Sequence, residues 1–270
     1  MRRTLVSIGV ILLLAMVGMP CVGIAAGAPA SGGSETLDPK AVEVMQKMGE
    51  HMASLQKFKV HSDRIMEVIL PNDQKLHSDR SADLFVQKPD RLRVTVTSAK
   101  RDMDFFYDGK TFTVYTPRQK YYASAPAKPT IGEMIEQASS EYDIEFPLVD
   151  VLYHHDVLLK EVMSGNYVGK SMIQGVMCHQ LAFRQKDIDW QVWVEEGNKP
   201  LLRRLVISDK SQKGEPLTII TLSNWDVSPT FEAGLFTFTP PADAQKIKFV
   251  TVGKEMGVQG ASTGAKPAKQ

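Results

Sequence analysis

Two segments of the chain have the apolar spacing of amphipathic helices. Between residues 38 and 57, apolar side chains recur every three or four positions, which predicts one helix with a single buried face. Asp38 and Pro39 fit its N-cap and its first position. Its apolar positions are Val42, Met45, Met48, Met52 and Leu55. A second helix is predicted over 130–140, behind the capping pair Thr130 and Glu133. Its apolar face consists of Ile131, Met134, Ile135 and Ala138.

Most of the remaining chain alternates apolar and polar residues with the period of a β-strand. Strands are predicted over 58–70, 75–87, 91–97, 105–107, 110–116 and 120–125, and again over 165–173, 176–186, 188–196, 201–210 and 216–226. Two short helical stretches, 147–153 and 156–162, are predicted between these two runs of strands. An extended piece from Leu235 to Thr239 and one more edge strand within 245–252 complete the pattern.

The order of these elements favours an antiparallel sheet. No helix separates successive strands within either run, so the sequence excludes the crossover connections that parallel strands need. A long sheet with few helices must bury its apolar face, and it does so by curling around them. We expect an α+β fold, in which a strongly curved antiparallel β-sheet forms an unclosed half-barrel of about 11 strands, with helices plugging its concave face.

The first residues have the pattern of a secretory signal peptide. Arg2 and Arg3 precede an apolar run from Leu5 to Val17, and small residues follow it. An uncleaved membrane anchor is the alternative, but a helix needs about 20 apolar residues to span a bilayer. The predicted segments are a signal peptide over 1–30, a linker over 31–36, a single domain over 37–252 and a disordered tail over 253–270. Three small-residue positions compete as the cleavage site.

The two cysteines bear on whether the exported protein is anchored by a lipid and whether a disulfide stabilises it. Cys21 would carry the lipid of a bacterial lipoprotein, but Met19 and Pro20 precede it where that signal requires small residues. Anchoring through Cys21 is therefore disfavoured. If Cys21 is removed with the signal, Cys178 is the one remaining cysteine, and an internal disulfide cannot form. The stability of the domain must then come from its packed core.

The charge balance excludes partners that are recognised by a broad electrostatic field. The chain has 32 Lys and Arg against 31 Asp and Glu, and loss of Arg2 and Arg3 with the signal leaves 30 bases against 31 acids. Such a balance gives no general attraction to nucleic acid or to anionic membrane surfaces. With 43% hydrophobic residues the composition is that of an ordinary globular protein. We expect any ligand to be held by burial, and we expect a monomer.

No motif in the sequence indicates a reaction. The stretch 164–171 resembles a phosphate-binding loop, but only three residues separate its glycines, and a strand pattern follows it. The neighbours in 154–156 and in Cys178-His179 point in different directions, so neither set is expected to share a metal or a substrate. Asp187 and Asp189 lie near a hairpin, where acids are normally solvated, and a Gly-x-Ser-x-Gly elbow is absent. We expect no catalytic residue, no metal site and no cofactor.

Three strings stand in order along the chain: Phe105–Lys110, Asp189–Glu195 and Leu235–Pro241. Together, and in this order, they resemble an uncharacterised family of predicted periplasmic proteins, a domain of unknown function related to the LolA/LolB-like lipoprotein-carrier superfamily. The resemblance implies a periplasmic protein with an unclosed antiparallel barrel and a helical lid over an apolar cavity. In the carriers that cavity holds acyl chains of lipoproteins. We carry over no residue role, and the carrier function is an analogy at the level of fold.

The methionine stripe of the first helix is the feature most suggestive of a ligand site. Thioether side chains adapt to variable apolar ligands, although the same stripe also suits an ordinary core helix. We expect the cavity to be lined by Met45, Met48, Met52, Leu55, Leu92, Val94, Val96, Phe112, Val114, Ile131, Met134, Ile135, Trp190 and Val192. The leading hypothesis is a non-catalytic periplasmic protein that binds a lipid or the acyl chain of a lipidated partner. The alternative is an interaction module with a filled core that docks to envelope proteins.

Overall fold

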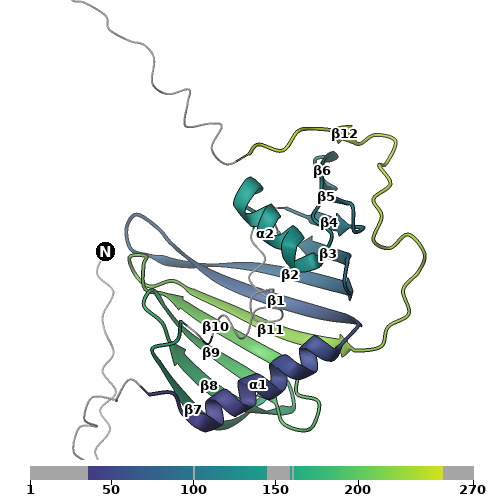
Figure 1. Ribbon diagram of the computed structural model, residues 1–270. Helices are drawn as coiled ribbons and strands as arrows, with labels where there is room; N and C mark the ends of the chain where they lie inside the picture. Colours follow the sequence, from purple (N-terminus) through teal and green to yellow (C-terminus); the bar gives the residue numbers. More distant parts are fainter. Residues whose placement is uncertain (1–35, 100, 145–158, 160, 252–270) are drawn as a thin grey trace, which may run out of the picture. The chain divides into compact units, whose positions relative to one another are not determined.

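The computed structural model describes residues 36–99, 101–144, 159 and 161–251, which form two helices and a 12-stranded sheet (Figure 1). The helices are α1 (Pro39–Ser54) and α2 (Ile131–Tyr142). The strands are β1 (Lys57–Ile69), β2 (Lys75–Gln87), β3 (Arg91–Thr97), β4 (Met103–Tyr107), β5 (Thr111–Thr116), β6 (Tyr121–Pro126), β7 (Ser164–Ile173), β8 (Val176–Arg184), β9 (Ile188–Glu195), β10 (Leu202–Asp209), β11 (Leu217–Asp226) and β12 (Gln245–Lys246). The predicted signal peptide and tail, the helical stretch 147–153 and residues 156–158 and 160 of the stretch 156–162 lie outside the described residues.

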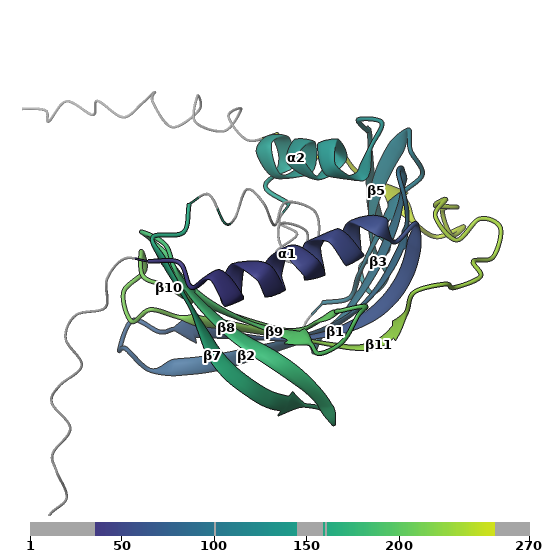
Figure 2. The ribbon, with the colours of Figure 1, turned by 60° about the horizontal axis from the view of Figure 1, so that its bottom comes forward.

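The strand order is β12-β6-β5-β4-β3-β2-β1-β11-β10-β9-β8-β7. The sheet has β12 and β7 at its edges and does not close into a barrel, and Figure 2 shows α1 lying along its concave side. The predicted α+β fold with a curved, unclosed antiparallel sheet is thus confirmed. One detail is wrong, because β12 pairs with β6 in parallel. A segment that reaches the edge strand after a long connection can pair with it in either direction. The order of the strands along the sequence therefore does not show whether this pairing is parallel or antiparallel.

Helix α1 is fixed to the sheet at both of its ends. At the N-cap, Asp38 accepts the backbone N–H of Lys40 at 2.8 Å and that of Tyr167, on β7, at 3.2 Å. Gly165 allows the close approach of this end, because a Cβ there would lie 2.9 Å from Leu37, which precedes the helix, and 2.6 Å from the Phe183 ring. At the C-terminus, the Lys88 ammonium donates to the carbonyl oxygens of Met52 and Ala53 at 2.9 and 3.0 Å. A cation at this position also complements the helix dipole.

Helix α2 begins with the predicted capping box. Thr130 accepts the backbone N–H of Glu133 at 3.3 Å, and its hydroxyl donates to the Glu133 carboxylate at 2.7 Å. The Ile131 N–H donates to the carbonyl oxygen of Pro89, in the β2–β3 turn, at 2.9 Å. The helix ends at Asp143, which adopts a left-handed conformation with φ 55°. These contacts set α2 against the β3–β6 part of the sheet.

The chain after β11 covers the convex side of β2–β6, and we call residues 227–240 the outer strap. The rings of Phe231 and Phe238 pack on Phe85 and Phe106, with ring centroids 6.3 and 5.3 Å apart. The expectation of an extended piece from Leu235 to Thr239 is wrong, because 233–237 forms turns. Gly234, at φ 88°, supplies the left-handed residue that reverses the chain there.

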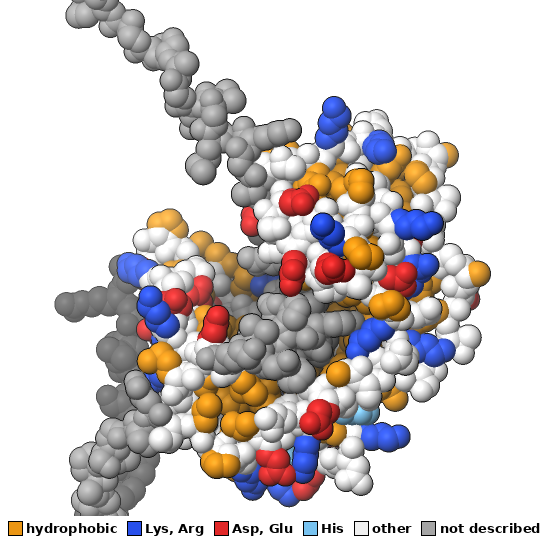
Figure 3. Space-filling view, in the orientation of Figure 1, with side chains coloured by type: hydrophobic (Ala, Val, Ile, Leu, Met, Phe, Trp, Pro, Cys, Tyr) orange, Lys and Arg blue, Asp and Glu red, His pale blue; other side chains and the backbone are white. Residues whose placement is uncertain are grey.

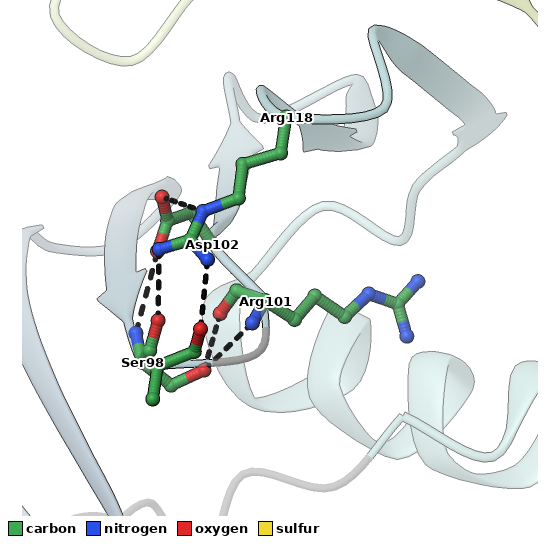
Figure 4. Close-up of polar contacts among 5 residues, drawn as sticks. Ser98, Arg101, Asp102 and Arg118 are labelled. Atoms are coloured by element: carbon green, nitrogen blue, oxygen red, sulfur yellow. Dashed lines mark hydrogen bonds and ion pairs between the residues drawn. The ribbon is translucent and has the colours of Figure 1, made fainter.

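Arg118 fixes the turn between β3 and β4 (Figure 4). Its guanidinium, from the β5–β6 turn, donates to both carboxylate oxygens of Asp102 at 2.8 and 3.2 Å. It also donates to the carbonyl oxygens of Ser98 and Ala99, each at 2.9 Å. The side chain of Arg101 points away from this cluster. The two neighbouring turns are therefore held together by one fully engaged arginine.

Candidate functional site

The side of the sheet that carries the helices, which we call the inner face, is built from aligned rows of apolar side chains. Strand register brings residues of neighbouring strands directly opposite one another, and alternation along each strand keeps every row on one face. One row consists of Val60, Leu84, Val94, Phe105 and Val114. A second consists of Met66, Thr218, Ile207, Trp190 and Phe183. These rows make a nearly continuous apolar surface across both halves of the sheet.

The structure brings all of the predicted cavity residues together on this inner face and its two helices. The residues in the buried core are Met45, Met48, Met52, Leu55, Leu92, Val94, Phe112, Ile131, Met134, Ile135, Trp190 and Val192. Val96 and Val114 are partly buried and pack against the same core. The residues are thus one contiguous set, although they come from strands and helices far apart in the sequence. That they contact a ligand stays a prediction.

The methionines of α1 are fully enclosed. Met45 and Met48 have no exposed surface, and Met52 is 1% exposed. Helix α1 lies over β7 and β9 on the inner face. The stripe therefore contributes to the core, as its alternative interpretation held. Burial and flexibility are compatible, because thioether chains repack at low cost when a neighbour moves.

Aromatic side chains fill the inner face beneath α2. The Phe112 ring stacks on Phe105, with centroids 5.8 Å apart, and touches the rings of Tyr142 and Phe249 at 5.4 and 5.3 Å. The hydroxyl of Tyr107 donates to the carbonyl oxygen of Lys128 at 2.6 Å. Burial raises the pKa of Tyr107 to about 12. This phenol is therefore a neutral hydrogen-bond donor that positions the chain leading into α2.

The apolar surface continues beyond the core to the far end of the β1–β2 hairpin. Val68 and Leu76, opposite each other on the inner face, are 40% and 43% exposed. Figure 3 shows apolar side chains at the surface at the upper left, where Figure 1 places this hairpin. A groove of about 660 Å³ lies between this end and the β10–β11 turn, with Met66, Ile69 and Pro216 among its walls. Its volume is within the range of about 300–1,000 Å³ that is usual for small-molecule sites.

Sequence reasoning missed the polar residues of the inner face. Arg64 and Arg80 lie directly opposite each other on β1 and β2. The signal was present in the sequence, since both arginines stand at positions that alternation assigns to the buried side. It could not be interpreted without the register that pairs the two strands.

The residues considered for chemistry lie apart, as their positions on strands require. Cys178 is buried, and burial raises the pKa of its thiol. Its neighbour His179 lies on the opposite face of β8, where its ring contacts the Tyr167 hydroxyl at 3.0 Å. Asp189 accepts from Arg184 and Lys210 at 2.9 and 2.8 Å, which holds the pKa of this carboxyl below its usual value. The described residues contain no group of three or more His, Cys, Asp or Glu placed to bind a metal ion. His154, His155 and Asp156, considered in the sequence as metal ligands, lie outside the described residues.

Within the described part of the chain, no helix has the length and apolar character needed to cross a bilayer.

Solved structures to which this chain is similar come from several bacteria. LprF from Mycobacterium bovis is 18% identical over 78% of this chain and 100% of its own, with a TM-score of 0.45. The lipoprotein LppX from Mycobacterium tuberculosis is 15% identical over 72% and 98%, with a TM-score of 0.46. A LolA superfamily protein from Nitrosomonas europaea is 12% identical over 73% and 97%, with a TM-score of 0.37. No curated protein matches the sequence.

A family model described as "Predicted periplasmic protein (DUF2092)" matches residues 41–250. The match includes both helices except Pro39 and Lys40 of α1, all twelve strands and the outer strap. It confirms the resemblance that three short strings of the sequence had indicated. The chain belongs to the DUF2092 family of predicted periplasmic proteins.

Proposed function

We propose that this protein is a non-catalytic periplasmic binding protein that holds a lipid, or the acyl chain of a lipidated partner, against the inner face of its sheet. The observation that carries the proposal is the extent of the apolar inner face. It runs from the core beneath the helices to Val68 and Leu76, which are exposed to solvent. Arg64 and Arg80 interrupt this surface on β1 and β2, but the row from Met66 through Ile207 to Trp190 joins its exposed end to the core, which suits a ligand that enters by one end.

Burial alone supplies enough free energy for such a ligand. Each methylene group transferred from water to an apolar surface contributes about 0.8 kcal/mol. Partly buried apolar side chains on the inner face, such as Val96, Ile188 and Ile207, offer surface that a chain can cover. The methionines of α1 and α2 can repack around it, because each has three rotatable side-chain bonds.

Lipid extraction tests the proposal directly. Protein purified from the periplasm is expected to carry lipid that organic extraction and native mass spectrometry detect. The double variant Val68→Asp/Leu76→Asp, which changes exposed side chains only, is expected to carry less. Val168→Asp is the matched control, because Val168 is 55% exposed on the edge strand β7. Absence of lipid, together with no stabilisation by added acyl chains, contradicts the proposal.

Exposed residues at the other end of the sheet favour the alternative, an interaction module that docks to envelope proteins. Val168 and Met172 on β7 and Met177 on β8 are 55%, 63% and 41% exposed, and β7 is an edge strand. The complete burial of Met45 and Met48 also fits a filled core. Under this alternative, Val168→Asp/Met172→Asp abolishes crosslinking to envelope proteins, whereas Val68→Asp/Leu76→Asp leaves it intact.

A further inference from the structure

We propose that Arg80, seated beside Arg64 on the inner face, binds the anionic headgroup of an amphiphile whose apolar chain lies along the same face. The headgroup chemistry is that of a phosphate or a carboxylate. The inference rests on the proposed function and adds the chemical class of the ligand. It also changes the expectation, drawn from the overall charge, that a ligand is held by burial alone.

The register of β1 and β2 places the two arginines together. Arg64 pairs with Arg80, and on its other side it pairs with Ile220 of β11, which is 2% exposed. The same row continues through Leu205, Val192 and Leu181, all of them buried. Residues directly opposite in an antiparallel pair have Cβ atoms about 4.5–5.5 Å apart. Two positive charges therefore stand side by side at the end of an apolar row.

The acids of these two strands are on the other side of the sheet. Asp63, Glu67, Asp79 and Asp83 all occupy positions that alternation assigns to the outer face. Three of them have partners there: Asp83 contacts His61 at 2.9 Å, Glu67 contacts Lys75 at 3.0 Å, and Asp63 accepts from Ser81 at 2.6 Å. Among the described strands β1–β6, the inner face thus offers Arg80 no carboxylate. A ligand is then the natural source of the negative charge.

Arg80 contrasts with the arginines that hold the fold together. Arg118 donates to Asp102 and to two carbonyl oxygens, and Arg203 donates to Glu195. Arg80 is exposed, and no hydrogen bond or ion pair joins it to another residue in the described part of the chain. Like charges directly opposite in a sheet are destabilising, so Arg80 beside Arg64 weakens the ligand-free fold. A bound anion removes that repulsion.

The position of the pair suits a molecule with one charged and one apolar part. Arg80 is exposed, whereas on one side the pair Ser62 and Ala82 is followed by the buried residues Val60 and Leu84. On the other side, Met66 leads to the exposed Val68. A headgroup at Arg80 stays in contact with water while its chain covers apolar surface. A guanidinium presents its N–H groups as a fork that matches the oxygens of phosphate and carboxylate.

Four probes and two variants of the full-length exported protein test this inference. The probes are oleate, oleyl phosphate, uncharged methyl oleate and inorganic phosphate, and binding is measured by titration calorimetry. Oleate and oleyl phosphate are expected to bind at least about tenfold more tightly than methyl oleate, because a single charge-assisted hydrogen bond to Arg80 is enough to change the affinity by about that factor. In Arg80→Gln this ratio is expected to fall to about one. Lys59→Gln, on the outer face of β1, removes the same charge and is expected to leave the ratio unchanged.

A second readout separates a binding role from a structural one. Arg80→Gln is expected to raise the melting temperature of the ligand-free protein, because it removes a like-charge pair. A purely structural arginine gives a loss instead, and that result overturns the inference.

The remaining outcomes separate a failure of the headgroup site from a failure of the proposed lipid-binding function on which it rests. Equal binding of oleate and methyl oleate, or a charge preference that persists in Arg80→Gln, overturns the headgroup site and leaves the lipid-binding proposal standing. Inorganic phosphate that binds as tightly as oleyl phosphate makes this a site for free anions and overturns the amphiphile. If none of the three oleyl compounds binds, both proposals fail.

Discussion

The two halves of the sheet close their faces in different ways. Strands β2–β6 are covered on both sides, by α2 on the inner face and by the aromatic residues of the outer strap on the convex face. Strands β8–β11 are covered on the inner face by α1, while their convex face carries polar contacts that meet solvent. Those contacts include Gln180 with Gln191 at 3.0 Å and Arg204 with Thr221 at 3.2 Å. One half is a three-layered structure and the other has two layers.

This difference indicates which half has freedom to change. A strand layer held between two apolar layers loses buried area whenever either cover moves. A layer with one polar, hydrated face depends only on the helix on its other side. Helix α1 covers the inner face of β8–β11 and carries the buried Met45, Met48 and Met52, while the equally buried Met134 is on α2. The arginine pair lies where the two halves meet, on β1 and β2.

Phe236→Ala is expected to have the largest effect on stability. Phe236, in the outer strap, is 8% exposed and meets the Phe231 ring edge-on at 5.3 Å. Truncation of a buried phenylalanine costs about 3–5 kcal/mol, and we expect the lower end. Ile219→Ala, on the uncovered convex face of β11, is the matched substitution and is expected to cost at most about 1 kcal/mol. Urea denaturation measures both, and equal costs would break the comparison between the halves.

Asp38→Ala tests how firmly α1 is held relative to α2. Loss of an N-cap costs about 0.5–2 kcal/mol, and Asp38 also accepts the N–H of Tyr167 from β7. We expect about 2 kcal/mol for Asp38→Ala and about 1 kcal/mol for Thr130→Ala, which removes only the cap of α2. Thermal unfolding of the two variants and the wild type gives the two losses of stability. A cost for Asp38→Ala no greater than that for Thr130→Ala means that the contact with β7 contributes nothing.

A smaller, pH-dependent effect is expected at His61, on the convex face of β1. Its hydrogen bond to Asp83, with Asp63 nearby, raises the pKa of His61 above 6.5. The folded state then binds the proton more tightly than the unfolded state. The added stability is fully present below pH 6.5 and is lost as the pH rises through the folded-state pKa. The stability difference between wild type and His61→Gln is therefore expected to be larger at about pH 5.5 than at about pH 8. The opposite trend contradicts the assignment of Asp83 as its partner.

The helices and most strands were predictable because a single local pattern determines each of them. The stripe Met45, Met48 and Met52 identifies the buried side of α1, and Thr130 with Glu133 identifies the start of α2. The inner-face residues of β3 follow from alternation, so Leu92, Val94 and Val96 were placed on the correct side. These features depend on residues close together in the sequence.

Features that depend on distant pairing could not be predicted. Leu235–Thr239 alternates like a strand, but its phenylalanines pack on an existing sheet face and Gly234 turns the chain. The parallel pairing of β12 with β6 joins residues more than a hundred positions apart. The meeting of Arg64 and Arg80 depends on the register of a long hairpin, and a shift of one residue would send one arginine to the other face.

The two-residue strand β12 also bears on self-association. A sheet with two bare edges can add further copies edge to edge without limit, and such contacts lead to fibres. Here the edge of β6 is already paired within the chain: the N–H groups of Gln245 and Ile247 donate to the carbonyl oxygens of Lys120 and Tyr122, each at 2.8 Å, and Lys120 pairs with Asp243. Copies that join through β7 alone can pair only β7 to β7, which stops at two. The pairing of Gln245 and Lys246 with Tyr121 and Tyr122 thus shortens the bare edge on the β6 side of the sheet.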